Sequence, residues 1–177
     1  MLPLRITQQF FMHISEGKDK FIEAWGRMAG EWGINRTMAQ VHALLLVSLE
    51  PLTADQVKEK LAISTGNASM NLRALMDWGL VYKHLKPGDR KEYYTAEKDI
   101  WNVVRQIIIQ RKKRELDPML KILEEVAGVE QDSPEAEHFA ATVGDIRKFS
   151  HKAHQTLDAL TKSDSGWFNN TFLSMLK

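Results

Sequence analysis

The stretch Ser64–Val81, STGNASMNLRALMDWGLV, decides how the rest of the chain is interpreted. At about 100° per residue, one side of a helix over this stretch is apolar. That side carries Ala68, Leu72 and Leu75. The opposite side is small and polar with a single cation, and it carries Gly66, Asn67, Ser69, Met70 and Arg73. Ser64 is a suitable N-cap, and Gly79 suits the left-handed position that ends many helices. The pattern is typical of an ordinary surface helix or of a helix that reads a DNA major groove.

A shorter helix is predicted directly before this stretch. Thr53-x-x-Gln56 has the spacing of a capping box, in which each side chain satisfies the other residue's backbone N–H. Val57 and Leu61 lie four residues apart and share one side of the helix. Two short helices joined by a tight turn, the second with a polar outer side, predict a helix-turn-helix.

A two-stranded hairpin is predicted directly after the polar-faced helix. Residues 81–86 alternate in the manner of a strand, Pro87-Gly88-Asp89 forms a turn, and residues 92–95 return as a β-rich run. Arg90 and Lys91 would lie at the tip. A basic hairpin in this position is a wing, which can lie against phosphates or insert Arg90 into a minor groove.

Further helices are predicted on both sides of this unit. Their expected ranges are 7–30 with Gly17 as a weak point, 36–49, a long helix from about residue 99, 134–161 and 167–176. Asn35 and Asp99 are the expected caps of two of them. At Pro118 the long helix should either kink or restart, with Asp117 as the new N-cap.

The fold class predicted is mostly α with a small β-wing: a winged helix-turn-helix plus a helical dimerisation region. Residues 1–34 would form the N-terminal helical part of the dimerisation region. Residues 35–96 would form the DNA-binding domain, and residues 97–177 the long linker helix and C-terminal dimerisation helices. The outer helices carry many large apolar side chains but no obvious core of their own. We therefore expect a second copy to cover them, the alternative being a monomer with a helical subdomain.

Charge is balanced overall but unevenly spread. The chain has 24 Lys and Arg against 23 Asp and Glu. From Lys83 to Arg114 there are ten basic residues against four acidic ones, and from Glu115 to Lys148 nine acidic against three basic. A basic segment of this kind favours one polyanion-facing side, the alternative being a solvated charge run.

Composition also limits the compartment and the chemistry. The chain has no cysteine, which excludes disulfides and thiol chemistry. It has no apolar run of the roughly 20 residues that span a bilayer and no signal-peptide pattern at its N-terminus, so we expect a cytoplasmic protein without a membrane partner.

With the helix-turn-helix and wing in place, the sequence resembles the MarR-type winged-helix regulators, and within them the GbsR-like branch of choline- and betaine-responsive repressors. The resemblance is carried by LTADQVKEKLAISTGNASMNLRALMDWGLV (52–81), KPGDRKEYYTAEKDIW (86–101) and RKKRELDPML (111–120). It implies a homodimer with one winged lobe per subunit. Asp89-Arg90 matches the family's acid–arginine wing pair, in which the acid helps to orient the wing.

The candidate DNA-contacting residues combine the helix, its cap and the wing tip. They are Ser64, Thr65, Asn67, Ser69, Met70, Arg73, Arg90 and Lys91. Met70 departs from the family, since many members carry a cation or a polar group there. An apolar contact with a thymine methyl group is the alternative role for it.

Other kinds of site are weakly supported. His138, His151 and His154 lack the cysteine or carboxylate pattern of a metal site, and no catalytic or nucleotide-binding motif occurs. We therefore predict no enzyme activity, no metal and no cofactor. The resemblance also suggests a small effector, and because aromatic cages bind quaternary ammonium groups, Trp25 and Trp101 are its candidate residues.

The function predicted is that of a sequence-specific DNA-binding transcriptional regulator, a repressor released by a small effector. The alternative is a winged-helix protein-interaction module that uses the same fold without DNA. A basic wing beside a nearly acid-free helix face favours the first.

Overall fold

A computed structural model describes residues 12–130 and 132–162. The chain divides into two compact units, Met1–Glu97 and Lys98–Lys177, which are described separately. The predicted helix at 167–176 and the first residues of the predicted helix at 7–30 lie outside the described ranges.

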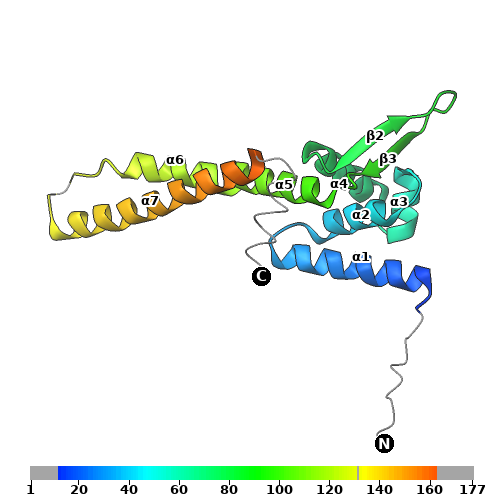
Figure 1. The fold of residues 1–177 in the computed structure, drawn as a ribbon, viewed down its shortest axis with the longest axis horizontal. Coiled ribbons are helices and arrows are strands. Elements are labelled where there is room, and N and C mark those ends of the chain that lie inside the picture. The colour runs from blue at the N-terminus through cyan, green and yellow to red at the C-terminus, as the bar shows by residue number, and fades with distance from the viewer. Residues whose placement is uncertain (1–11, 131, 163–177) are drawn as a thin grey trace, which may run out of the picture. The chain divides into compact units, whose positions relative to one another are not determined.

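The first unit begins with two helices packed on each other, α1 (Ile14–Glu31) and α2 (Arg36–Val47) (Figure 1). The sequence predicted a helix from residue 7, but the described residues 12 and 13 are not helical and α1 starts at Ile14. Gly17 does not interrupt the helix. Asn35 caps α2 as predicted, its Oδ1 accepting from the Met38 N–H at 2.9 Å. α2 ends two residues earlier than predicted, at Val47.

The helix-turn-helix consists of α3 (Ala54–Leu61) and α4 (Thr65–Asp77). Both predicted bonds of the capping box at Thr53 and Gln56 are present, at 3.3 and 2.8 Å. Ala62 takes the left-handed conformation, with φ of 51°, which turns the chain sharply between the two helices. Gly79, with φ of 69°, then ends α4 as predicted.

The wing is part of a three-stranded sheet rather than the predicted two-stranded hairpin. β2 (Val81–Leu85) and β3 (Glu92–Ala96) pair antiparallel, with Lys83 opposite Tyr94. The short strand β1 (Leu52–Thr53) pairs with the other edge of β3, placing Leu52 opposite Tyr94. Because β1 ties the hairpin base to the start of α3, the wing and the helix-turn-helix share one framework.

The core of the first unit lies among α1 to α4 and the base of the sheet. Its most deeply buried side chains include Val41, Ala43, Leu45, Val57, Ala68, Leu72 and Leu75, each at most 1% exposed. Trp78 and Tyr94 close it beside the sheet, at 6% and 7% exposed. Of the two tryptophans of the first helical segment, Trp25 is half-buried, whereas Trp32 is 58% exposed in the single chain.

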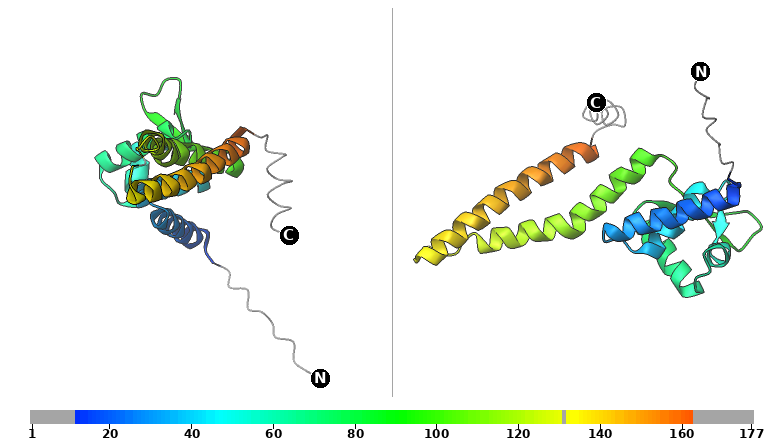
Figure 2. Two further views of the ribbon diagram at one scale, coloured as in Figure 1. Left: turned by 90° about the vertical axis from the view of Figure 1, so that its left-hand side faces the viewer. Right: turned by 90° about the horizontal axis from the view of Figure 1, so that it is seen from below.

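The second unit is a helical hairpin, with α7 (Pro134–Lys162) returning along α5 (Ile100–Arg111) and α6 (Asp117–Val126) (Figures 1 and 2). Asp99 caps α5 as predicted. Between α5 and α6 the chain stays helical and does not restart. A π-helical turn at Lys112–Leu116 accommodates Pro118 instead, and Asp117 is helical rather than an N-cap.

The predicted fold class is confirmed: the chain is mostly helical, with a small antiparallel sheet that forms the wing. Within residues 12–130 and 132–162, no helix is both long and apolar enough to cross a membrane.

Candidate nucleic-acid interface

α4 is held by one apolar side and one cap. Ala68, Leu72 and Leu75 are 0–1% exposed and fix the rotation of the helix about its axis. The Ser64 hydroxyl accepts from the Asn67 N–H at 3.2 Å and fixes where the helix begins. The side chains on the outer side are therefore presented from a rigid base.

The outer side of α4 is open to solvent. Thr65, Ser69, Met70 and Arg73 are exposed, and Met70 is 60% exposed. A shallow depression runs along this side, lined by Gly66, Ser69, Met70, Arg73, Ala74 and Asp77. Six of the eight candidate DNA-contacting residues belong to this helix or its cap, and Asn67 alone among them is half-buried rather than exposed.

Asn67 is held by a residue that the sequence did not single out. Asn71, which is 3% exposed, donates through Nδ2 to the Asn67 backbone carbonyl at 2.8 Å and to Asn67 Oδ1 at 2.6 Å. The sequence offered one signal of this role: Asn71 is a polar residue directly before Leu72, which lies on the apolar side of the predicted helix. The pair lies on the same helix edge, four residues apart.

The wing tip is organised around Asp89. Its carboxylate accepts from the Lys91 N–H at 2.9 Å and from the Tyr93 hydroxyl at 2.7 Å, and Gly88 turns the chain with φ of 79°. The Tyr93 hydroxyl, followed by the Lys91 N–H, holds the pKa of Asp89 below its usual range. The same bond raises the pKa of Tyr93. The backbone around Arg90 is thus fixed on both sides.

The wing cations differ in what they contact. Lys83 pairs with Glu92 at 2.9 Å, and Lys86 lies over the Tyr93 ring with Nζ 4.2 Å from its centre. Arg90 and Lys91 are exposed and form no side-chain ion pair with any residue in the described ranges. Their charge is therefore available to an external anion.

Charge also links α4 to the wing. Burial and a 2.7 Å bond to Glu92 raise the pKa of Tyr94 to about 12, while the charge of Arg73 acts in the opposite direction. Arg73 on α4 thus lies close enough to Tyr94 on β3 for its charge to be felt. Arg73 itself stays exposed.

The predicted effector residues lie in different units. Trp25, on α1, is half-buried, with its ring 5.5 Å from that of Phe21 and 6.2 Å from that of His42. Trp101 is half-buried in the first turn of α5. The ring contacts of Trp25 are with residues of its own unit.

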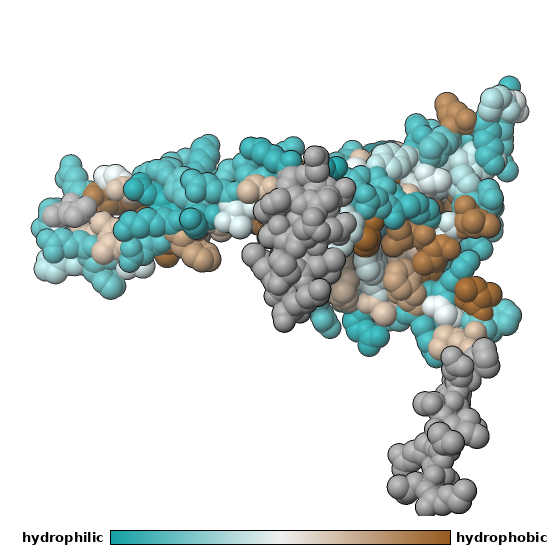
Figure 3. Space-filling view, viewed as in Figure 1, coloured by the Kyte–Doolittle hydropathy of each residue, from teal (hydrophilic) through white to brown (hydrophobic). Residues whose placement is uncertain are grey.

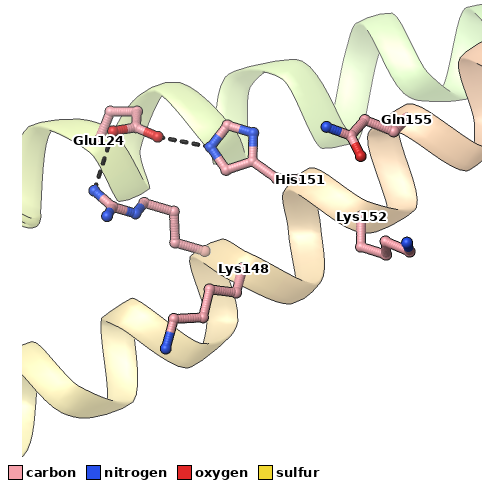
Figure 4. Close-up of a pocket in the computed structure, with 6 residues that line it drawn as sticks. Glu124, Lys148, His151, Lys152 and Gln155 are labelled. Atoms are coloured by element: carbon pink, nitrogen blue, oxygen red, sulfur yellow. Dashed lines mark hydrogen bonds and ion pairs between the residues drawn. The ribbon is translucent and has the colours of Figure 1, made fainter.

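The second unit contains the three histidines considered for a metal. His151 Nε2 lies 2.7 Å from Glu124, which also pairs with Arg147 at 3.3 Å (Figure 4). His154 lies 3.4 Å from Asp117. Both are cross-links between α6 and α7, and the described part of the chain contains no group of three metal-ligating side chains.

Helices α2, α3 and α4 followed by the β2–β3 hairpin define a winged helix-turn-helix domain, with a polar helix face and a basic wing tip. Residues 32–92 match the model of the MarR family. The resemblance expected from the sequence is confirmed: this segment is similar to the MarR family and forms a winged helix-turn-helix.

The chain is also similar to individual proteins. It is 25% identical over 115 residues to the HTH-type transcriptional repressor GbsR of Bacillus subtilis (strain 168), a match that covers 65% of this chain and 63% of that protein, so it spans less than two thirds of the relative's length. A solved structure described as a transcriptional regulator shares the fold, with a TM-score of 0.62 and 20% identity over 81% of this chain and 95% of the other. A mutant of S. aureus MepR bound to an oligodeoxyribonucleotide, 17% identical over 75% of this chain and 89% of the other, aligns only with a TM-score of 0.39.

Proposed function

We propose that the protein binds duplex DNA in a sequence-specific manner as a homodimer and regulates transcription, acting as a repressor. One observation supports this most. Arg73 on the outer side of α4 and Arg90 and Lys91 at the wing tip are exposed, and none of the three forms an ion pair with a described residue. Cations that an internal carboxylate does not neutralise can displace counterions from phosphates. The name of a relative, a transcriptional repressor, supports repression as the direction of regulation.

The roles divide between helix and wing. Thr65, Asn67, Ser69, Met70 and Arg73 would face the major groove from α4, with Ser64 at its start close to a phosphate. Arg90 and Lys91 would contact the backbone or the minor groove from the wing. The bonds of Asp89 support this division, since a fixed tip loses little conformational entropy on binding.

A homodimer is proposed from the apolar surface of the helices. Large hydrophobic side chains remain exposed on the second unit: Ile100, Met119, Ile122, Val129, Phe139, Ile146 and Phe149. Figure 3 shows hydrophobic residues interrupting the hydrophilic surface of α6 and α7 on the side viewed. A second copy would cover such residues. The α4 helices of the two copies, here called the recognition helices, would then read DNA half-sites about 34 Å apart.

The alternative is a winged-helix module that binds protein rather than DNA. A titration of fluorescent duplex from the region upstream of the protein's own gene, at several salt concentrations, separates the two. DNA binding predicts affinity well above that for random duplex and a steep decrease with salt. Equal affinity for cognate and random duplex at every salt concentration would favour the protein-interaction module.

Effector release is the finer part of the proposal, with Trp25 and Trp101 as candidates. A ligand could act only by binding better to one spacing of the recognition helices than to the other. By linkage, a choline-like effector that weakens DNA binding must itself bind less tightly to the DNA complex. Calorimetric titration of choline and betaine with and without operator measures this difference. Equal affinities would remove these ligands as effectors.

A further inference from the structure

Among the candidate DNA-contacting residues on α4, Asn67 is the one whose side chain is bonded to a buried side chain of the same helix. Among the described residues, its carboxamide forms a single side-chain hydrogen bond, in which Oδ1 accepts from Asn71 Nδ2 at 2.6 Å. Asn71 is 3% exposed, so its side of this bond is shielded from solvent. The other candidate residues on α4 have no such partner beneath them.

The chemistry of the pair leaves no ambiguity about which atom is oxygen and which is nitrogen. The same Asn71 atom that meets Asn67 Oδ1 also lies 2.8 Å from the Asn67 backbone carbonyl. A carbonyl oxygen can only accept, so this Asn71 atom must be the donating Nδ2. The Asn67 atom facing it must then be the accepting Oδ1, because two amide nitrogens would repel each other.

This orientation limits what Asn67 can offer a base. Asparagine usually reads adenine with both ends of its carboxamide, donating to N7 and accepting from the N6 amino group. With Oδ1 turned towards Asn71, the carboxamide cannot present both of its ends to one base edge without giving up that bond. The Nδ2 group remains, and it can only donate. In the major groove guanine presents two acceptors, N7 and O6, whereas adenine presents one acceptor beside a donor and cytosine presents only a donor.

We propose that Asn71 is a specificity-determining positioning residue, which holds Asn67 as a hydrogen-bond donor and makes it select guanine over adenine at its base pair. This inference rests on the proposed DNA binding. It goes further by naming the base that one residue reads, and by assigning a role to a residue that does not touch DNA.

The test is a double-mutant cycle of Asn67→Ala and Asn71→Leu, in which the quantity measured is the preference for one base over another. Binding-site selection with the intact protein first locates the base pair that Asn67→Ala no longer discriminates. Asn71→Leu, which replaces the buried amide by an apolar group of similar size, should then free Asn67 and shift the guanine-to-adenine preference there by about tenfold towards adenine. In the Asn67→Ala background, Asn71→Leu should change nothing at that position.

Leu72→Ala is the matched control for a purely structural role. Leu72 neighbours Asn71 and is 1% exposed, so its truncation lowers the melting temperature without releasing Asn67 Oδ1. Base preference should stay as in the wild type. A shift of equal size in Leu72→Ala would show that loosening α4 is sufficient, and would overturn the proposal.

Two further results would also overturn it, and they are distinguishable. If the wild type selects a specific site but Asn71→Leu leaves its base preferences unchanged, only the role of Asn71 fails. If the wild type selects no site, the proposed function fails first and the inference with it. Nuclear magnetic resonance of the free protein adds a readout without DNA: Asn71→Leu should increase the mobility of the Asn67 side-chain amide, and unchanged mobility would contradict the proposed contact.

Discussion

The wing and α4 contrast with the α6–α7 hairpin in how their charges are used. The second unit also holds many charged side chains, and several of them pair with one another. Lys112 contacts Asp158 at 2.7 Å, Arg147 contacts Glu124 at 3.3 Å, and Lys148 contacts Asp145 at 3.3 Å. At the wing tip the one nearby acid, Asp89, is occupied by a backbone N–H and a tyrosine hydroxyl instead.

This difference shows why a count of charges along the chain is a weak guide to a polyanion-binding surface. The basic segment from Lys83 to Arg114 includes the cluster that leads into the π-helical turn. There Arg111 pairs with Glu115 and Lys112 with Asp158, so two of the cations in this segment are used within the second unit. The candidate interface depends on a few exposed cations, Arg73, Arg90 and Lys91, that form no side-chain ion pair with a described residue.

α4 is anchored on a buried core, whereas the α6–α7 hairpin leaves many apolar side chains exposed. The largest predicted effect on stability tests this difference. Leu75→Ala should lower the free energy of unfolding by about 2–5 kcal/mol, because Leu75 is 1% exposed and anchors α4 on the core. Chemical denaturation followed by circular dichroism measures the loss. A change below about 1 kcal/mol would mean that α4 is not held as described.

Ile122→Ala is the companion substitution in the hairpin, where Ile122 is 53% exposed. In a monomer it should cost little, since most of the side chain already contacts water. If a second copy covers it, the cost becomes larger and the melting temperature becomes dependent on protein concentration. A concentration-independent melting temperature would argue against the proposed dimer surface.

The next effect is on recognition. Arg73→Ala should weaken binding to the cognate site by roughly 1–3 kcal/mol while leaving random duplex little affected, because Arg73 lies on the α4 face rather than at the wing tip. Fluorescence anisotropy on both duplexes measures the difference. Equal losses on both would reassign Arg73 from base reading to phosphate contact.

A smaller effect should distinguish free from paired cations. Arg90→Ala should weaken cognate and random duplex alike and reduce the slope of log affinity against log salt by about one, the value for one lost phosphate contact. Lys148→Ala, which removes a hairpin cation paired with Asp145, should leave affinity and slope unchanged. If Arg90→Ala also left the slope unchanged, the wing assignment would be wrong.

Much of the fold could be predicted because its signals are local. Capping residues such as Asn35, Thr53 and Asp99 act within three residues of the helix start, so sequence alone reveals them. β1 was missed because two residues carry no periodic pattern, and only pairing with β3 makes them a strand. The π-helical turn was missed because a proline near a helix start looks the same whether the helix restarts or continues.

The candidate site was predictable in its outline and not in its internal contacts. Periodicity separates the two sides of α4, but it cannot show that Asn71 turns back to bond Asn67. Similarly, the turn at Gly88-Asp89 was visible, whereas the bond from the Tyr93 hydroxyl to Asp89 depends on the strand register that aligns the hairpin.

The smallest predicted effect concerns this wing-tip bond. Because the charged Asp89 carboxylate raises the pKa of Tyr93 above its ordinary value of 10.0, Asp89→Asn should lower the pKa of Tyr93 towards 10.0. Tyr82, whose hydroxyl bonds Glu97 at 2.8 Å, should be unaffected. Titration of the tyrosine side-chain resonances resolves the residues individually. Glu97→Gln is the matched control, which should lower the pKa of Tyr82 and leave that of Tyr93 unchanged.

The sign of each shift sets the pH range in which the wing tip is held. The pKa of Asp89 is lowered on folding, so its contribution is present above its ordinary pKa of 3.8 and is lost as the pH falls through the lower folded-state value. The pKa of Tyr93 is raised, so its contribution is present below 10.0 and is lost as the pH rises through the higher folded-state value. The bond should therefore persist across the neutral range. If Asp89→Asn left the pKa of Tyr93 unchanged, the tip would not be fixed by this pair, and Arg90 would reach DNA from a mobile loop rather than a preset one.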